Sequence, residues 1–427
     1  MTAHMVTSPT GSSLQRLAER SWDRIADGSR LFYENQEWTG AQLADRAKRL
    51  AGGLREAGLR RGERVLICMA NCPEVGVSYH AIWRAGGVST PVLFLLSEDE
   101  LRHVLSDSGA VLAITTPEFL PKVAAAAAGL GSVRAIVVAG EAGHPEATHP
   151  EAVQPDGSVP LLPLAELERA EPAGLTDADP AGLAALLYTG GTTGRSKGVM
   201  ISHNALSASS WAATLSSHDP SLATSLLPLP LSHVYGLMVS VMTLHTPEPG
   251  TSVLMRWFDP TGWLTLAQRH RVNISPLVPS MLAMLAQQPI EDFDLSALSR
   301  LTSGAAPLPR QVADDLRERL PNVEIAEGYG CTETAAIISS SPLGQSRPGS
   351  VGRPAAGVRL RIELPDGTEA GAGEDGEICV AGPMLMSGYW NAPAETEQTM
   401  RGGWLHTGDV GRMQDGYLYI VDRIKDL

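Results

Sequence analysis

Residues 188–198, YTGGTTGRSKG, combine glycines, hydroxyl side chains and one lysine, which together suit the binding of a phosphate group. Glycines let the backbone approach a ligand and turn its N–H groups toward it, and threonines add hydroxyl donors. Lys197 adds a point charge suited to phosphate. The candidate phosphate-binding residues are Thr189, Gly190, Gly191, Thr192, Thr193, Gly194 and Lys197. A flexible glycine turn is the alternative that composition alone leaves open.

The segments on either side of this loop have contrasting patterns. The preceding LAALLYT predicts a buried strand, and the following VMISHNALSAS predicts the start of a helix. A helix that began there would place its N-terminus near a bound anion. The loop differs from the P-loop of nucleoside triphosphatases, in which lysine directly follows the last glycine, because Arg195 and Ser196 intervene here.

The elements that must position this loop alternate between strands and helices over roughly the first 340 residues. Thr39 and Gln42 form a capping-box pattern before a helix with apolar residues at helical spacing. Apolar runs at 65–70, at VLAITT and at VRAIVVAG follow helical segments, which predicts parallel α/β sheets flanked by helices. Residues 140–160, rich in proline, glycine and acids, predict an exposed loop within this pattern.

The pattern changes near residue 340. VRLRIEL alternates with a period of two, PDG turns the chain, EICVA runs back and YLYIVD closes the series. This is typical of an antiparallel sheet, and we expect a small barrel or sandwich.

Composition narrows the class of protein. The 427 residues are 43% hydrophobic and 19% charged, which allows a sizeable core, and the net charge of −14 argues against nucleic-acid binding. Four cysteines without paired zinc spacing favour reduced thiols in a cytoplasmic protein. The N-terminus lacks a signal-peptide pattern, and no apolar run is long enough to predict a membrane span. A homodimer is left open.

YTGGTTGRSKGV resembles the signature loop of the adenylate-forming superfamily, which includes acyl-CoA synthetases, adenylation domains and luciferase. Two positions depart from the usual pattern: Gly190 replaces a serine, which removes a hydroxyl donor, and Ser196 replaces a proline, which loosens the loop. Further family motifs follow in the family's order. They are LPLPLSHVYGL at 227–237, FDP at 258–260, LTSGAAPLP at 301–309, EGYGCTET at 327–334, GEDGEICVAGPMLMSGYWNAPAET at 373–396, GGWLHTGDVG at 402–411 and DRIKDL at 422–427.

This resemblance implies a large AMP-binding domain over residues 1–422. It has two Rossmann-like α/β subdomains to about 340 and a small antiparallel β-barrel at about 341–422. Residues 423–427 would be a hinge, with Lys425 as the pivot, and the family's C-terminal lid domain would be absent from this chain. We therefore expect the chain to bind nucleotide but to turn over slowly.

The resemblance also implies a role for each motif residue. Tyr329 would stack on adenine, Thr332 would donate to the α-phosphate and Glu333 would hold Mg²⁺. Asp409 would accept hydrogen bonds from both ribose hydroxyls, and Arg423 would reach the ribose. The remaining implied site residues are His233 between acyl pocket and phosphate, and Gly304, Ala305, Ala306, Gly328, Gly330 and Cys331 around the nucleotide and acyl group.

The implied reaction has two halves. A carboxylate attacks the α-phosphate of Mg·ATP to give acyl-AMP and pyrophosphate, and the thiol of coenzyme A then displaces AMP. The first half depends on positioning and charge stabilisation and needs no general base, because the acid is already ionised.

The stretch after His233, HVYGLMVSVM, has no acid to pair with an amino-acid substrate. The visible pocket candidates are apolar or small, which favours an uncharged fatty, aryl or alicyclic acid: they are Val234, Leu237, Gly304, Ala305 and Cys331. Arg256 could pair with a dicarboxylate, although MRWFDP reads as a strand end. Two alternatives to an acyl-CoA ligase stay open. One loads a carrier protein, and the other binds preformed acyl-adenylate without making it.

Overall fold

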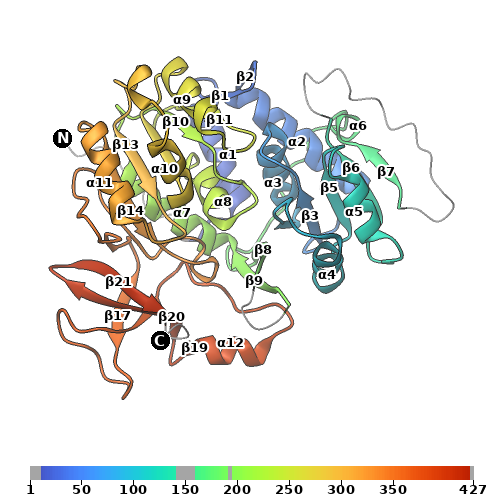
Figure 1. Cartoon of the computed structure of the whole chain (residues 1–427). Helices are drawn as coiled ribbons and strands as arrows, with labels where there is room; N and C mark the ends of the chain where they lie inside the picture. Colours follow the sequence, from blue (N-terminus) through green and yellow to red (C-terminus); the bar gives the residue numbers. More distant parts are fainter. Residues whose placement is uncertain (1–10, 141–158, 191–194, 424–427) are drawn as a thin grey trace.

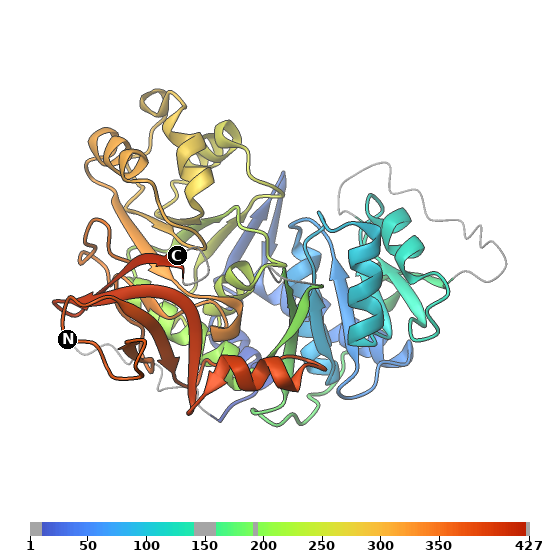
Figure 2. The same cartoon turned by 60° about the horizontal axis from the view of Figure 1, so that its bottom comes forward.

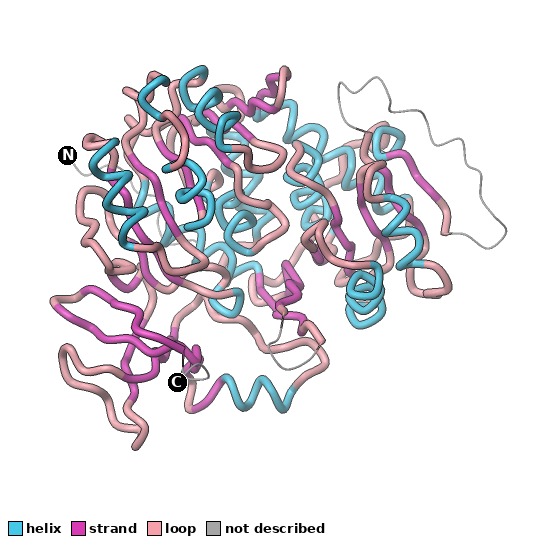
Figure 3. Tube along the Cα trace, in the orientation of Figure 1, coloured by secondary structure: helices cyan, strands magenta, loops and turns pink. Residues whose placement is uncertain are grey.

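The computed structural model describes residues 11–140, 159–190 and 195–423 (Figure 1). Three sheets organise this part of the chain, and helices cover the two larger ones (Figure 3). Among the described residues, no helix combines the length and the apolar character that crossing a membrane would require.

The first sheet has seven strands, all of them from residues 64–202. They are β3 (Arg64–Cys68), β4 (Val88–Pro91), β5 (Leu112–Thr115), β6 (Ala135–Val138), β7 (Leu161–Pro163), β8 (Leu183–Thr189) and β9 (Lys197–Ser202). The spatial order is β7-β6-β5-β3-β4-β8-β9, and only β8 and β9 run antiparallel. Strands β4, β5 and β6 are buried at every residue, as expected for a parallel sheet covered on both faces.

The helices of this layer are α1 (Leu14–Ile25), α2 (Gly40–Glu56), α3 (Pro73–Ala85), α4 (Glu98–Ser108), α5 (Leu120–Ala127) and α6 (Leu164–Leu167). The predicted capping box begins α2: the Thr39 hydroxyl accepts from the Gln42 N–H at 3.1 Å, and Gln42 Oε1 accepts from the Thr39 N–H at 2.8 Å. Without these two bonds, the backbone N–H groups of Thr39 and Gln42 would be unpaired at the start of the helix.

The second sheet has nine strands and includes the N-terminal hairpin. They are β1 (Arg30–Tyr33), β2 (Gln36–Thr39), β10 (Thr224–Leu227), β11 (Thr251–Leu254), β12 (Ile274–Leu277), β13 (Arg300–Ser303), β14 (Glu324–Tyr329), β15 (Ser339–Ser340) and β16 (Arg353–Pro354). The order is β16-β15-β14-β13-β12-β10-β11-β1-β2, with a parallel centre from β14 to β1. The chain therefore starts in the second sheet before it builds the first.

Five helices pack around this sheet. They are α7 (His203–Ser217), α8 (Val234–Met242), α9 (Pro260–Arg269), α10 (Pro279–Ala286) and α11 (Arg310–Arg319), with 3₁₀ turns at Ile290–Asp292 and Thr332–Thr334. One apolar cluster runs from the helices of the first sheet through α7 and α8, so both layers share a core.

The third sheet is antiparallel and curled, as predicted. Its strands are β17 (Arg359–Glu363), β18 (Gly376–Ala381), β19 (Met400–Arg401), β20 (Trp404–Gln414) and β21 (Tyr417–Arg423), and α12 (Pro393–Thr399) precedes β19. The pairing path β17-β18-β20-β19, with β21 on β20, is open among the described residues. In Figure 2 the red strands of this sheet lie beside the second layer, whereas the orange-red helix α12 lies close to the green strands, in agreement with the contact between Glu395 of α12 and Lys197 of β9.

The expected helix directly after the phosphate-type loop is wrong. Residues 197–202 form strand β9, and α7 begins only at His203, where the Ser202 hydroxyl accepts from the Ala205 N–H. Val199 and Ile201 are fully buried in β9, so β-branched residues pairing with β8 outweigh the helical pattern that starts further along. The N-terminus of α7 is thus six residues away from Lys197.

Candidate active site

A cavity of about 800 Å³ is lined by residues of both α/β sheets and by Tyr389 and Arg423, which belong to the part of the chain that forms the third sheet. It collects most of the predicted site residues. Those that line it are Thr189, Gly190, Lys197, His233, Gly304, Ala305, Gly328, Tyr329, Gly330, Cys331, Thr332, Glu333 and Arg423. Asp409 joins the set through a hydrogen bond with Tyr329. The predicted convergence of residues far apart in sequence is therefore present in the structure.

Six predicted positions fall elsewhere. Ala306 is exposed and is not among the described residues that line the cavity. Five lie outside the described residues, so their placement stays a prediction: Gly191, Thr192, Thr193, Gly194 and Lys425.

Strands β8 and β9 hold the two described ends of the loop together. Thr189 and Lys197 are register partners, so both stand where the strands leave the sheet. The Ser196 carbonyl lies 2.9 Å from His103 Nε2, which anchors the end of the loop to α4. A Cβ added to Gly190 would meet no described atom within 4 Å, so crowding does not impose the glycine that replaces the usual serine.

Lys197 is held at the rim of the cavity by weak contacts. Its Nζ lies 3.7 Å from Glu395 Oε1 and 5.6 Å from the centroid of the Tyr389 ring. About a third of the lysine side chain is exposed, and ion pairs with this exposure contribute little free energy. The ammonium is therefore available to a competing phosphate.

Glu333, the predicted metal ligand, is oriented by a residue without an assigned role in the sequence. The Tyr389 hydroxyl donates to Glu333 Oε1 at 2.8 Å, while the Met386 N–H donates to the Glu333 carbonyl at 2.7 Å. Burial and the nearby carboxylate raise the pKa of Tyr389, so it stays a hydrogen-bond donor. The Cys331 thiol also hydrogen-bonds this carboxylate. A carboxylate offers about four lone-pair sites, so these two contacts leave it able to bind a cation.

The chain around Tyr389 is fixed by pairing with β9. The Met200 N–H donates to the Gly388 carbonyl at 3.0 Å, and the Trp390 N–H donates to the Gly198 carbonyl at 2.7 Å. Trp390 Nε1 also donates to the Asp107 carbonyl at 3.0 Å, which ties this segment to the first sheet's layer. Backbone hydrogen bonds thus join strand β9, which begins at Lys197, to the segment whose Tyr389 orients Glu333.

The Asp409 carboxylate is largely buried and already bonded on both oxygens. The Tyr329 hydroxyl donates to Oδ2 at 2.6 Å, and Arg423 Nε pairs with Oδ1 at 2.8 Å. Asp409 and Arg423 are register partners on β20 and β21. Each carboxylate oxygen has a second lone pair, so a diol could share the group or displace Tyr329 from it.

Glu377 fixes the backbone that leads to Asp409. Its Oε1 accepts from the Gly408 N–H at 3.1 Å, and its Oε2 lies 2.8 Å from His406 Nδ1. The Thr407 hydroxyl donates to the Ile378 carbonyl and accepts from the Asp409 N–H. The position of the candidate ribose acceptor therefore follows from the pairing of β18 with β20.

The turn after β14 is tightly packed. A Cβ at Gly330 would lie 2.0 Å from the Ala336 carbonyl oxygen, so only glycine fits there. Ala305, Ala335 and Ala336 all have positive φ values, of 70°, 49° and 93°. Such strain in alanine persists only where surrounding packing enforces it, and it clusters here around one cavity.

His233 caps α8 at the edge of the cavity. Its Nδ1 accepts from the Tyr235 N–H at 3.3 Å, so the neutral ring carries its proton on Nε2. Burial lowers the pKa of His233 below its ordinary value, which favours this neutral form. His233 is exposed and lines the cavity, so its Nε2–H is available as a donor to a ligand.

The acyl-pocket candidates separate into two groups. Val234, Gly304, Ala305 and Cys331 line the cavity, whereas Leu237 is fully buried in the core. A Cβ at Gly304 would stand 3.3 Å from Tyr235 Cε1, so the missing side chain makes room for the tyrosine ring.

Arg256, the candidate partner of a dicarboxylate, is not among the described residues that line the cavity. Its guanidinium pairs with Glu118 and with the Tyr33 hydroxyl.

Sequence reasoning missed Tyr389, Tyr235 and Glu327, all of which line the cavity. Burial raises the pKa of Glu327. Each stands inside or directly beside a motif stretch, and that position is the only sequence signal that could have suggested it. Glu395 also stands in a motif stretch, but only the placement of α12 shows that it reaches Lys197.

Comparisons with known proteins agree with this geometry. The AMP-binding enzyme family matches residues 14–390. A feruloyl-CoA synthase of an Amycolatopsis species is 36% identical over 400 residues, which cover 91% of this chain and 74% of that protein. The long-chain-fatty-acid–CoA ligase of Bacillus subtilis is 31% identical over 435 residues, which cover 97% of this chain and 77% of that protein.

Solved structures give the same result. The anthranilate CoA ligase AuaEII in complex with anthranoyl-AMP matches with a TM-score of 0.87 at 25% identity, over 98% of this chain and 79% of that chain. ATP-bound MatB from Rhodopseudomonas palustris matches with a TM-score of 0.84 at 30% identity, over 97% of this chain and 80% of that chain. The chain therefore belongs to the AMP-binding enzyme family and is an ATP-dependent acyl-CoA ligase.

Proposed function

We propose that the chain activates an uncharged, largely apolar carboxylic acid as its acyl-AMP with Mg·ATP, and that coenzyme A is the acceptor. The observation that carries this proposal is the convergence of Lys197, Glu333 and Tyr329 on one cavity, with Asp409 bonded to Tyr329. An aromatic acid agrees with the feruloyl- and 4-coumarate-CoA ligases among the relatives.

The residues around the phosphates act by position and charge. Lys197 leaves its weak pairing with Glu395 for the leaving phosphates, and Thr332 offers a hydroxyl to the α-phosphate. Glu333, oriented by Tyr389, would hold Mg²⁺, and the bound ion would supply charge neutralisation at the phosphates. Because hard cations prefer carboxylate oxygens, the Glu333 carboxylate fits this ion.

The residues around the acid orient its carboxylate and exclude water. The His233 Nε2–H donates a hydrogen bond toward the carboxylate or the α-phosphate. The charged residues Lys197 and Glu333 belong to the phosphate side of the cavity, while the acyl side carries Val234, Met238 and Cys331. An uncharged acyl group therefore avoids the cost of burying an unpaired charge.

The test is a panel of carboxylic acids incubated with the chain and Mg·ATP. Acid-dependent release of pyrophosphate, with acyl-AMP identified by mass spectrometry, is the expected result. Adding coenzyme A or a carrier protein bearing a phosphopantetheine thiol then identifies the acceptor. Binding of an acyl-adenylate mimic without pyrophosphate release from any acid would favour the alternative of a domain that only accepts preformed adenylate.

A further inference from the structure

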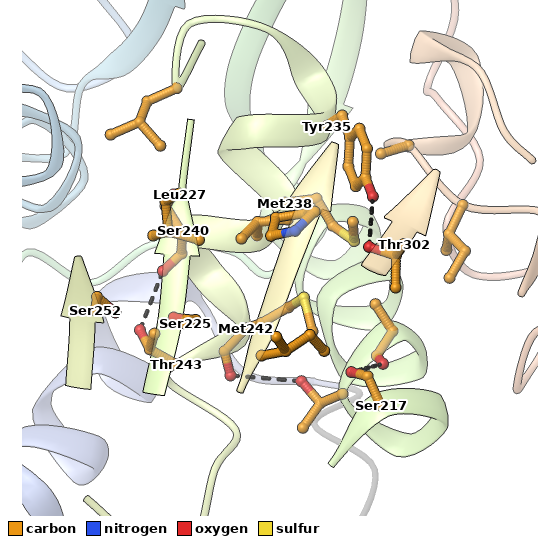
Figure 4. Close-up of a pocket in the computed structure, with 18 of the residues that line it drawn as sticks. Ser217, Ser225, Leu227, Tyr235, Met238, Ser240, Met242, Thr243, Ser252 and Thr302 are labelled. Carbon is orange, nitrogen blue, oxygen red and sulfur yellow. Dashed lines mark hydrogen bonds between the residues drawn. The ribbon is translucent and has the colours of Figure 1, made fainter. Parts of the chain in front are cut away.

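The deep part of the cavity lies along the inner face of the second sheet. The register places Ser225 of β10 beside Ser252 of β11, and Ile274 of β12 lies on the other side of Ser225. All three side chains line the cavity, and Leu227 and Pro276 line it two residues further along their strands. Figure 4 shows Ser225 and Ser252 on neighbouring strands, together with Met238 and Met242 of α8. We call Ser225 and Ser252 the serine pair.

The serine pair faces the cavity because of strand alternation. Leu226 and Val253, the next residues along each strand, are buried in a separate cluster with Trp263 of α9 on the opposite face of the sheet. Ser225 and Ser252 are only partly buried, although their strands lie in the interior of the sheet. The cavity is the space that keeps them accessible.

The hydroxyls of the serine pair have unused hydrogen-bonding capacity. Ser225 Oγ reaches the Thr251 carbonyl only at 3.5 Å, which is long for a hydroxyl hydrogen bond. Within the described part of the chain, no hydrogen-bond partner is found for the Ser252 hydroxyl. By contrast, the Ser240 and Thr243 hydroxyls on the same cavity donate to helix carbonyls at 2.7 and 3.1 Å.

The charge at this depth is already compensated. Arg300, which neighbours Ile274 in register and lines the cavity, pairs with Glu324 at 2.8 Å. It therefore does not require a carboxylate from the substrate. The open hydroxyls beside Leu227, Met238 and Met242 suit a ligand end that is apolar apart from one uncharged oxygen.

The separation of Gly304 and the serine pair, which line the same cavity, sets the length of the ligand. Gly304 follows Arg300 by four residues, and Arg300 is level with Ser225 through Ile274. At about 3.3 Å per residue, the serine pair lies roughly 13 Å from Gly304, measured along the strands. After allowance of about 3 Å for a hydrogen bond, an aromatic ring joined to the carboxylate by a short linker has the right reach.

We propose that Ser225 and Ser252 are specificity-determining residues that hydrogen-bond an uncharged oxygen, a hydroxyl or an ether, at the end of an aryl acid remote from its carboxylate. This inference rests on the proposed function, since it assigns the acyl group that the same site activates.

The test compares 4-hydroxycinnamate with cinnamate, which differ only in the distal hydroxyl. For each acid, kcat/KM for pyrophosphate release and the dissociation constant are measured with the wild type, Ser225→Ala, Ser252→Ala and the double variant. We expect the wild type to prefer the hydroxylated acid, and each alanine to lower that preference about three- to tenfold, which is the net effect of one hydrogen bond.

Ser275→Ala is the matched control. Ser275 is a fully buried serine of β12, and its hydroxyl donates to the Leu226 carbonyl at 2.8 Å and accepts from Trp263 Nε1, away from the cavity. This variant should leave the ratio between the two acids unchanged. An equal shift in Ser275→Ala, or an unchanged ratio in the double variant, would overturn the inference.

The two readouts separate the two proposals. Equal turnover of both acids by the wild type supports the proposed function and overturns the role of the serine pair. A binding preference for the hydroxylated acid that the alanine variants abolish, without pyrophosphate release, supports the serine pair and counts against the proposed function.

Discussion

The two α/β sheets have similar strands but use them differently. In the first sheet, β4, β5 and β6 are buried at every residue, and helices cover both faces. In the second sheet, β10 and β11 each begin with a partly buried Thr-Ser pair, and their last two residues are buried. The serines are only partly buried because the inner face of these strands borders the cavity. The same parallel topology thus serves as a closed core in one layer and as the floor of a binding site in the other.

A polar residue in a parallel strand indicates either a structural hydrogen bond or a neighbouring cavity. The strands of a sheet covered on both faces are expected to be continuously apolar, so a serine at the centre of such a sheet requires a reason. Ser275 has a structural reason, because it bonds Trp263 Nε1 and the Leu226 carbonyl. The serine pair has none of that kind, and the adjoining cavity explains why it is tolerated.

The largest expected effect is at Glu333, which lines the cavity to which both α/β sheets contribute residues. Glu333→Gln keeps the shape of the side chain but removes the charge that would hold Mg²⁺. We expect kcat for adenylation to fall about 10²–10³-fold for every acid, as for the loss of one preorganised charge-stabilising group. Pyrophosphate release measures the effect, and the exposed Glu318→Gln is the control. A variant of Glu333 with nearly wild-type kcat would remove this residue from the reaction.

Matched truncations in the two sheets should differ in stability. Ile67→Ala, at a fully buried position of strand β3, should lower the free energy of unfolding by about 3–4 kcal/mol without changing acid preference. Leu227→Ala should cost only about 1–2 kcal/mol, because its side chain already borders a cavity and leaves less new empty space. Urea denaturation measures both. Equal losses would mean that the second sheet is packed as densely as the first.

A smaller effect is expected for Tyr389→Phe. Loss of the hydroxyl removes the hydrogen bond that holds the Glu333 side chain in one rotamer. We therefore expect a three- to tenfold rise in the Mg²⁺ concentration that gives half the maximal rate. Tyr417→Phe removes a hydroxyl that donates to the Gln345 carbonyl at 3.0 Å in a different part of the molecule, and it should leave this value unchanged. If both variants show the same Mg²⁺ dependence, Tyr389 does not position Glu333.

The smallest expected effect concerns buried histidines between the layers. Burial lowers the pKa of His203 and of His245 to about 4. Since the ordinary value is 6.5, the unfolded chain takes up protons between pH 6.5 and 4 that the folded chain does not, and stability falls as the pH decreases through this window. Each histidine should contribute about 1 kcal/mol of this loss between pH 7.5 and 5.5.

His203→Gln should flatten the loss of stability with acidification by that amount, as measured by urea denaturation at pH 7.5 and pH 5.5. An unchanged dependence in the variant would show that His203 takes up its proton without unfolding.

Much of the fold could be predicted because the relevant signals are local. The Thr39–Gln42 cap, the buried runs of the first sheet and the period-two strands from Arg359 all depend on neighbours in sequence. The helix expected after Lys197 was wrong because tertiary pairing with β8 and with residues 387–390 made that segment a strand. The pairing of β1 with β11 joins residues more than 200 apart, and no local pattern could have revealed it.

By itself the sequence determined the chemical types and their order: a glycine- and threonine-rich loop with a lysine, then Tyr329, Glu333 and Asp409 in motif stretches. Only the tertiary structure decided that Tyr389 orients Glu333, that Asp409 is bonded by Tyr329 and Arg423, and that the serine pair faces an open floor. The physical reason is that residue type and spacing set local geometry, whereas hydrogen-bond partners and empty space depend on which distant strands pack together.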